Sequence, residues 1–337
     1  MRPVLKHCIL LLFFFTGSHF TGFSQQGGMA DTTRLEKQLP ILNKKLFLQF
    51  PAAATVSPRV ADIMASDPNE NRETRIIVDN GKMRLVFFAQ ELFSLAGNDM
   101  LDELSKQVEP EFDFQRKVLT DSASLLSVLS TPALFDSTQN GILVNSLTIK
   151  SPDNTVSRID AYINPDAWSL RNEYVSLTET VFKTLLTGTR TIPLNARTET
   201  FKIPGTTAQF QFALPEKYFI TLDEKYDFSV FKINKYKKLT DDTYTSITIY
   251  TGRYPSLFHK EYGFSDSMAA NAKGIFLGDN PEWLYFKDDV NKFYLKEQIS
   301  PATELGGGLV FHVAQLTNKK DIMEEMTAIV AKIKLIK

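Results

Sequence analysis

The sequence contains very little cysteine and histidine. Its 337 residues include one cysteine, Cys8, and four histidines. Cys8 lies in a segment that we expect to be cleaved, so the exported chain would have no disulfide, thiolate metal site or thiol nucleophile. The two histidines outside that segment, His259 and His312, are distant in sequence and belong to no close-spaced ligand pair. The sequence therefore predicts no metal and no cofactor.

Long hydrophobic runs are also missing. The longest apolar run, residues 9–15, is far shorter than the roughly 20 residues that span a bilayer, so we expect no transmembrane segment. Arg2 and Lys6 precede this run and small residues follow it, which is typical of a signal peptide over residues 1–24. We therefore expect export to the periplasm or the outside. Cys8 stands before the apolar run, so a lipoprotein is not expected.

Neither charge sign is in excess. The 38 basic and 39 acidic residues give a formal net charge of −1, and removing Arg2 and Lys6 would bring it to about −3. Without a basic block, the chain is a poor candidate for binding nucleic acid. A composition of 43% hydrophobic and 12% aromatic residues is typical of a globular protein, and the length favours two domains.

Local patterns predict how these domains are divided. In the first half, residues 45–51 predict a strand ended by Pro51, Asn80-Gly81 predicts a hairpin turn, and residues 91–108 predict a helix. A second hairpin is expected over residues 141–163, followed by an amphipathic helix that carries Tyr174, Leu177, Val181 and Leu185 and stops at Gly188. The expected segments are a flexible tail (25–44), a first α+β domain (45–190), a linker (191–205) and a second α+β domain (206–337).

The second half repeats this order of elements. A strand around Phe210 and Phe212 ends at Pro215, further strands are expected at 228–233, 245–251, 293–299 and 308–314, and a closing helix carries Ile322, Met326, Ile329 and Ile333. Each domain is thus predicted to be an antiparallel sheet with packed helices. The shared order favours a degenerate tandem duplication. The alternative is that two unrelated α+β domains each end in a helix.

The second half resembles a known superfamily. The stretch from Phe210 to Tyr218, the apolar strands that follow and the helix from Ile322 to Ile333 are similar to the PsbP-like α/β/α sandwich superfamily. The resemblance covers residues 208–337 and rests on element order, with the same order repeated in the first half. It implies a non-enzymatic adaptor or assembly fold. No family motif is shared, so no site residue is carried over.

Few groups of residues suggest a catalytic or ion-binding site. Ser256, His259 and Asp266 are close in sequence, but there is no G-x-S-x-G elbow to expose a nucleophile. His312 alternates with apolar residues and is expected to be a packed strand residue. Four other groups are expected to be turns or solvated loops: Asp241-Asp242, Asp288-Asp289, the stretch 67–73, which lacks the calcium-loop order, and Gly306-Gly307-Gly308, which precedes a strand and not a helix.

One region stands out for its aromatic content. Residues 250–294 are rich in aromatics, are interrupted by glycine and proline, and are interpreted as a loop-rich insertion. Aromatic side chains on loops offer large contact areas at low entropic cost. The sequence therefore predicts a ligand-binding or partner-binding patch made of Tyr254, His259, Tyr262, Trp283 and Tyr285.

Taken together, these features favour binding over catalysis. We expect an exported adaptor or assembly protein of the bacterial cell envelope, which should expose an apolar patch around Trp283 to an unknown protein partner. One alternative is a protein that captures a small apolar ligand in a closed cavity between helix and sheet. A second alternative is a hydrolase of unknown type, with a pocket that joins His259 or His312 to acids with shifted pKa values.

Overall fold

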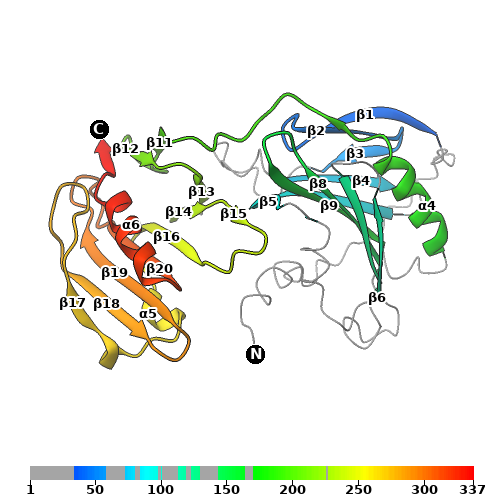
Figure 1. The fold of residues 1–337 in the computed structure, drawn as a ribbon. Helices are drawn as coiled ribbons and strands as arrows, with labels where there is room; N and C mark the ends of the chain where they lie inside the picture. Colours follow the sequence, from blue (N-terminus) through cyan, green and yellow to red (C-terminus); the bar gives the residue numbers. More distant parts are fainter. Residues whose placement is uncertain are drawn as a thin grey trace. The chain divides into compact units, whose positions relative to one another are not determined.

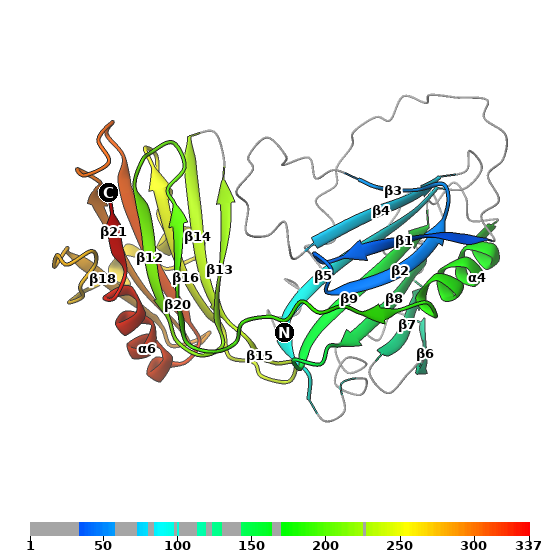
Figure 2. The same cartoon turned by 90° about the horizontal axis from the view of Figure 1, so that it is seen from above.

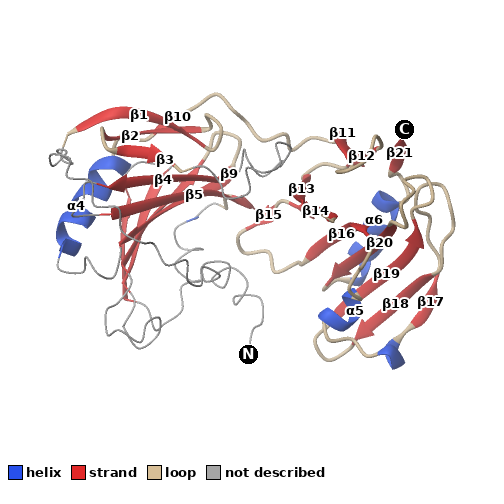
Figure 3. Cartoon of the chain, turned by 180° about the vertical axis from the view of Figure 1, so that it is seen from behind, coloured by secondary structure: helices blue, strands red, loops and turns tan. Residues whose placement is uncertain are grey.

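A computed structural model describes residues 34–57, 73–79, 84–97, 100, 113–118, 123–129, 143–163, 170–224 and 227–337. The expected signal peptide and residues 25–33 lie outside this range. Among the described residues, one compact unit takes residues 34–192 and 238–242, and a second takes residues 193–237 and 243–337. Antiparallel strands make up most of the regular structure, and helices are few (Figures 1 and 3).

The first unit combines a small sheet, a large sheet and a helix. The small sheet has the strand order β1-β2-β10, and the large sheet follows the path β3-β4-β5-β9-β8-β7-β6. Helix α4 (Arg171–Phe182) contacts β2, β8 and β9 (Figure 1). The strands are β1 (Leu35–Ile41), β2 (Leu46–Pro51), β3 (Ala54–Val56), β4 (Glu73–Asp79), β5 (Arg84–Leu95), β6 (Asp113–Val118), β7 (Ala123–Leu129), β8 (Leu143–Lys150), β9 (Thr155–Ile163) and β10 (Leu186–Thr187).

The core of the first unit lies on one face of its large sheet. Alternate residues of β5, namely Leu85, Phe87 and Ala89, point to this face, as the period of two in a strand requires. Tyr174 and Val181 of α4 and the apolar residues of β2 pack against them. Helix and small sheet together cover this face of the large sheet.

The second unit has the same kinds of parts. Its small sheet has the order β11-β12-β21, and its large sheet the order β13-β14-β16-β20-β19-β18-β17. Helix α6 (Lys320–Val330) contacts β12 and β20 (Figure 2). The remaining elements are β11 (Arg197–Lys202), β12 (Gln209–Leu214), β13 (Tyr218–Glu224), β14 (Phe228–Lys235), β16 (Thr245–Gly252), α5 (Phe258–Glu261), the 3-10 helix η2 (Asp266–Met268), β17 (Ala270–Ala272), β18 (Trp283–Asp288), β19 (Phe293–Pro301), β20 (Val310–Thr317) and β21 (Lys334–Ile336). The two-residue strand β15 (Lys237–Lys238) follows β14 in the chain.

Both faces of this second large sheet are covered, by different elements. One face packs against α6 and the small sheet, through residues such as Phe231, Phe311 and Met326. The other face carries a smaller apolar cluster that includes Phe286 and Leu295 and lies under α5. Neighbouring residues of one strand therefore point into two different environments.

Several sequence predictions are confirmed. Strands β4 and β5 form the hairpin expected around Asn80-Gly81, although the turn itself lies outside the described residues. Strands β8 and β9 form the second hairpin, and β2, β12, β14, β16, β19 and β20 lie where strands were expected. Both closing helices are present as α4 and α6, with Tyr174 and Met326 buried.

Other predictions are wrong. The first part of the helix expected over residues 91–108 is strand, because residues 91–95 continue β5 and its pairing with β9 through a bulge at Phe93, which has φ 53°. Met100 is helical, and residues 98–99 and 101–108 lie outside the described residues. Residues 35–41 of the expected tail form β1, and the expected linker contains β11. Helix α4 ends at Phe182, well before Gly188. The region 250–294 is rich in loops, as expected, and it also contains the short elements α5, β17 and β18.

Candidate functional site

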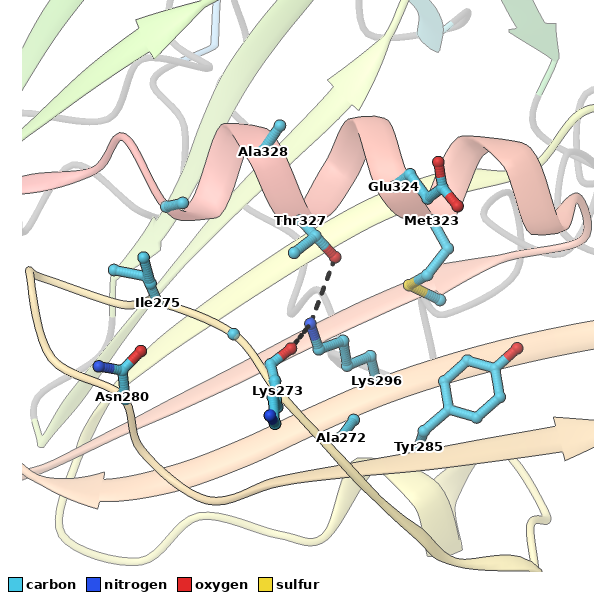
Figure 4. A pocket seen from close by; sticks show the side chains of 12 residues that line it. Ala272, Lys273, Ile275, Asn280, Tyr285, Lys296, Met323, Glu324, Thr327 and Ala328 are labelled. Carbon is cyan, nitrogen blue, oxygen red and sulfur yellow. Dashed lines mark hydrogen bonds between the residues drawn. The ribbon is translucent and has the colours of Figure 1, made fainter.

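A groove of about 670 Å³ lies in the second unit, between α6 and the large sheet. One wall is α6, and the opposite wall is the segment that follows β17, including Lys273, Gly274 and Ile275 (Figure 4). Tyr285 of β18 and Lys296 of β19 line it from the sheet.

The sequence of α6 explains why this wall leaves space. Met326 and Ile329 are buried in the core, so the adjoining flank of the helix faces the groove. Met323, Thr327 and Ala331 follow one another at intervals of four residues along this flank. Because Ala331 and the neighbouring Ala328 have only a methyl side chain, the space beside them stays open.

Lys296 places a buried positive charge in the groove. The residue is 5% exposed, and its Nζ donates to the carbonyl oxygen of Lys273 at 2.7 Å and to Oγ1 of Thr327 at 3.4 Å. Nζ also lies 4.8 Å from the centre of the Trp283 ring. Among the described side chains no carboxylate forms an ion pair with Lys296, and burial lowers the pKa of its ammonium group. Neutral dipoles and a ring face are thus its only partners.

A second donor lies next to this ammonium group. Trp283 is 1% exposed, and its Nε1 has no hydrogen-bond acceptor among the described residues. A Cβ added to Gly274 would lie 2.8 Å from this Nε1 and 2.9 Å from Nζ of Lys296. Only glycine fits at position 274, and two hydrogen-bond donors converge on its Cα.

The residue after Lys296 has the opposite charge and points to the opposite face. Glu297 is 4% exposed, and strand alternation turns its side chain away from α6 toward α5. Charged residues are rarely this buried unless they are paired. Strand β19 therefore carries two buried charges side by side, of which only Glu297 has charged or ionisable partners.

Glu297 links α5 to the sheet. Its Oε2 accepts from Nδ1 of His259 at 2.8 Å and from the backbone N–H of His259 at 3.1 Å. Its Oε1 accepts from the backbone N–H of Phe258 at 2.9 Å and from Nε2 of His312 at 2.5 Å. One carboxylate thus joins two histidines that are distant in sequence, and both lie against aromatic rings, His259 on Phe286 and His312 on Phe258.

These hydrogen bonds set the charge of the acids. Burial by itself raises the pKa of Glu297, but hydrogen bonds from His312 and His259 outweigh it and hold the pKa below its ordinary value. The hydrogen bond between Nε2 of His259 and Asp266, at 2.8 Å, likewise lowers the pKa of that exposed carboxyl. Both ring nitrogens of His259 therefore face ionised carboxylates.

Ser256 does not pair with this histidine cluster. The hydroxyl of Ser256 donates to Glu261 and not to His259, whose two ring nitrogens are occupied. His312 is fully buried in β20. In the part of the chain that the structure describes, no group of three or more His, Cys, Asp or Glu side chains is placed to hold a metal ion.

The five predicted binding residues lie on opposite faces of the sheet. Tyr285 lines the groove, and Trp283 lies beneath it, so the expectation of an exposed patch around Trp283 is wrong. Tyr254, 81% exposed, and Tyr262, 46% exposed, belong to the α5 region with the buried His259. Burial of its hydroxyl raises the pKa of Tyr262, and its ring stacks on Phe258. The expected single patch is therefore two separate surfaces.

The other groups noted in the sequence have structural roles where they are described. Gly306, Gly307 and Gly308 all have positive φ, between 67° and 70°, and form a turn as expected. Asp288 accepts from the backbone N–H groups of Val290 and Asn291 in another turn. Residues 67–72 lie outside the described residues.

Sequence reasoning missed Lys296, although a signal was present. The expected strand 293–299 contains Lys296 and Glu297 in its middle, after the apolar stretch Phe293-Tyr294-Leu295. Two adjacent charges in a central strand must point to opposite faces and be buried on both. The sequence alone did not reveal that only Glu297 has charged or ionisable partners.

Comparison with known proteins assigns this chain to no family. No family model matches the sequence, and no curated protein matches it. Among solved structures, the immunity protein TplEi of T6SS from Pseudomonas aeruginosa, with an "L" peptide or in its apo form, is 10% identical with a TM-score of 0.22. Each match covers 88% of this chain and 96% of the other. A TM-score this low assigns no shared fold.

None of the helices in the described ranges is both long enough and apolar enough to cross a membrane.

Proposed function

We propose that this chain is an exported, non-catalytic binding protein of the bacterial cell envelope, and that its second unit captures a small ligand with an apolar body. The observation that carries the proposal is the groove of about 670 Å³ beside α6. Its walls combine apolar side chains, such as Ile275 and Met323, with a few polar groups, as small-molecule sites do. The groove is open to solvent, in contrast to the closed cavity that the sequence suggested.

We also propose that the two units are α+β domains related by duplication. The supporting observation is the strand order. In each unit a hairpin forms two strands of a small sheet, seven strands form the main path of the large sheet, a helix follows, and a last strand returns to the hairpin. Strands β1, β2 and β10 take the places of β11, β12 and β21. The PsbP-like resemblance of residues 208–337 remains part of this proposal.

The test of ligand capture is to fill the groove. Ala328 is exposed on α6 and lines the groove, so Ala328→Trp should block it without disturbing the core. The matched control is Lys320→Trp, at an exposed position on the same helix outside the groove. The probe is the neutral apolar fluorophore N-phenyl-1-naphthylamine, whose emission rises when it leaves water.

We expect the mature wild-type chain and Lys320→Trp to bind the fluorophore alike. Ala328→Trp should weaken binding about tenfold or more, because it removes the contact surface of an apolar ligand. Equal affinities of the two tryptophan variants would show that the groove is not the binding site.

A second candidate function is the adaptor role, at the α5 surface. The observation that favours it is a group of exposed apolar residues in and around α5, on the face opposite the groove: Tyr254, Leu257, Tyr262 and Met268. Large apolar groups gathered on a surface mark protein contact sites. Crosslinking in native envelopes tests this role. A partner that is captured by the wild type and by Ala328→Trp, but lost in the double variant Tyr254→Ala/Tyr262→Ala, would support it.

A further inference from the structure

The two buried charges of β19 differ in a way that points to the ligand. Glu297 accepts four hydrogen bonds, from two histidine rings and two backbone N–H groups. Lys296, equally buried, has a carbonyl oxygen, a hydroxyl at the long distance of 3.4 Å and an aromatic ring. A buried charge without a counter-charge costs stability. The sequence therefore keeps a cation in the groove that the fold itself does not neutralise.

The donors around Lys296 are incompletely used. An ammonium group has three N–H donors, and two of them point to Lys273 and Thr327. The indole N–H of Trp283 has no acceptor among the described residues, and it converges with the ammonium group on Gly274. Trp283 is not among the residues that line the groove, so the ammonium group of Lys296 is the donor that a ligand in the groove can reach. A carboxylate accepts from an ammonium group, and its negative charge would compensate the cation.

The other residues that line the groove narrow the chemical class of the ligand. Three charged residues line it, namely the buried Lys296 and, with exposed side chains, Lys273 and Glu324. The carboxylate of Glu324 disfavours a second negative group on the ligand, and the site lacks the arginine fork typical of phosphate recognition. Ile275, Met323 and the two alanines of the α6 flank offer apolar surface.

We propose that the groove binds a monocarboxylic acid with an apolar body, and that its carboxylate pairs with the ammonium group of Lys296. This inference rests on the proposed capture function and specifies its ligand class. The apolar body lies along the α6 flank, and the acid group lies at the buried end beside Gly274.

The test compares an acid with its neutral counterpart. Decanoate and decanamide have the same chain and differ in charge, and each is titrated against the mature chain to displace N-phenyl-1-naphthylamine. We expect decanoate to bind at least about tenfold more tightly than decanamide, since a charge-assisted pair exceeds a neutral hydrogen bond by that order. In Lys296→Met this preference should disappear.

A matched pair of surface variants tests the same inference if Lys296→Met does not fold. Ala328→Glu and Ala328→Gln are alike in shape, and position 328 is an exposed helix site. The glutamate should weaken decanoate about tenfold relative to the glutamine and leave decanamide unchanged, because it adds a negative charge to the groove wall and repels the acid.

The pH dependence supplies a further readout. Burial lowers the pKa of Lys296, and a bound carboxylate favours the protonated form. Decanoate affinity should therefore fall as the pH rises through this lysine's pKa, below the 10.5 of an exposed lysine, while decanamide affinity stays constant.

The possible failures are distinct. If decanoate and decanamide displace the fluorophore equally from the wild type, the capture function stands and the carboxylate inference is overturned. If neither ligand binds and Ala328→Trp does not alter fluorophore binding, the capture function itself fails.

Discussion

At the scale of single residues, burial decides what a charge does. Lys296 and Glu297 are neighbours, and each is at most 5% exposed, yet they belong to different surfaces. The hydrogen bonds to Glu297 fasten α5 to the sheet and use the acceptor capacity of its carboxylate. The ammonium group of Lys296 still has donor capacity left. Stability therefore explains one member of the pair, and the proposed ligand would account for the other.

Replacing Glu297 should destabilise the second unit in a pH-dependent way. Glu297→Gln removes a carboxylate that serves two histidines and two backbone N–H groups, so we expect a loss of about 3 kcal/mol at neutral pH. In the folded chain the pKa of this group lies below its value in the unfolded chain. Its stabilisation is therefore complete above the unfolded pKa of about 4.5 and is lost as the pH falls through the folded pKa.

Urea unfolding between pH 3 and pH 7 measures this effect. The stability difference between wild type and Glu297→Gln should be largest near neutrality and shrink below about pH 4.5. Glu282→Gln, at an exposed position of the same unit, is the control and should leave the unfolding free energy nearly unchanged. A difference that is constant over this pH range would argue against an ionised Glu297.

At the scale of elements, the segment after α4 is held by a buried polar cluster. Nζ of Lys45 donates to Oγ1 of Thr155 at 2.7 Å and lies 3.8 Å from Oε1 of Glu91. Nη1 of Arg190 lies 3.0 Å from the same oxygen and donates to the carbonyl of Leu42. These contacts fix β10 beside β2, where the backbone N–H of Gly188 donates to the carbonyl of Lys45 at 2.7 Å.

Gly188 is expected to tolerate no side chain. A Cβ at this position would lie 1.8 Å from the carbonyl oxygen of Lys44, which is backbone and cannot turn away. Gly188→Ala should therefore destabilise the first unit by about 2 kcal/mol or more. Thermal unfolding measures it.

Gly205→Ala separates this clash from backbone strain. Gly205 has φ +73° and nothing within 4 Å of an added Cβ, so we expect a cost of about 1 kcal/mol from conformation alone. If Gly188→Ala were no more destabilising than Gly205→Ala, that result would contradict the close approach of residue 188 to the carbonyl oxygen of Lys44.

The elements that sequence reasoning found are those with local signals. Tyr174 and Val181 repeat at helical spacing, and a turn signal lies between β4 and β5, so α4 and this hairpin were predictable. Residues 91–95 have apolar spacing that suits a helix, but pairing with β9 overrides it. Aromatic residues in β18 looked like a surface patch because no local pattern shows that Gly274 and Lys296 lie against Trp283.

The sequence predicted only some of the residues at the groove. Two of its neighbours, Trp283 and Tyr285, were singled out because of their residue type. Lys296 and Gly274 were not, since their importance depends on a contact between β19 and a segment more than twenty residues earlier. The identity of a single residue does not show whether its buried charge will have a counter-charge.

At the scale of the whole molecule, the two units have separate cores. The apolar cluster of the first unit shares no residue with the two clusters of the second. Each unit should therefore unfold as its own cooperative transition.

Calorimetry on the mature chain should resolve two transitions. Gly188→Ala should lower only the transition of the first unit, and Glu297→Gln only that of the second. The effects of the two changes in one chain should add, because the sites share no partner. A single transition that shifts with either variant would instead indicate one cooperative body.

The last strand of each unit bears on when the unit can fold. Strand β10 pairs with β2 through Leu186 and Phe47, and β21 pairs with β12 through Leu335 and Phe210. During synthesis, the first small sheet can close once residue 187 has left the ribosome or the export channel. The second must wait for residue 336, with the edge of β12 that pairs with β21 open until then. A chaperone that meets the growing chain would therefore find an open strand edge in the second unit after the small sheet of the first unit has closed.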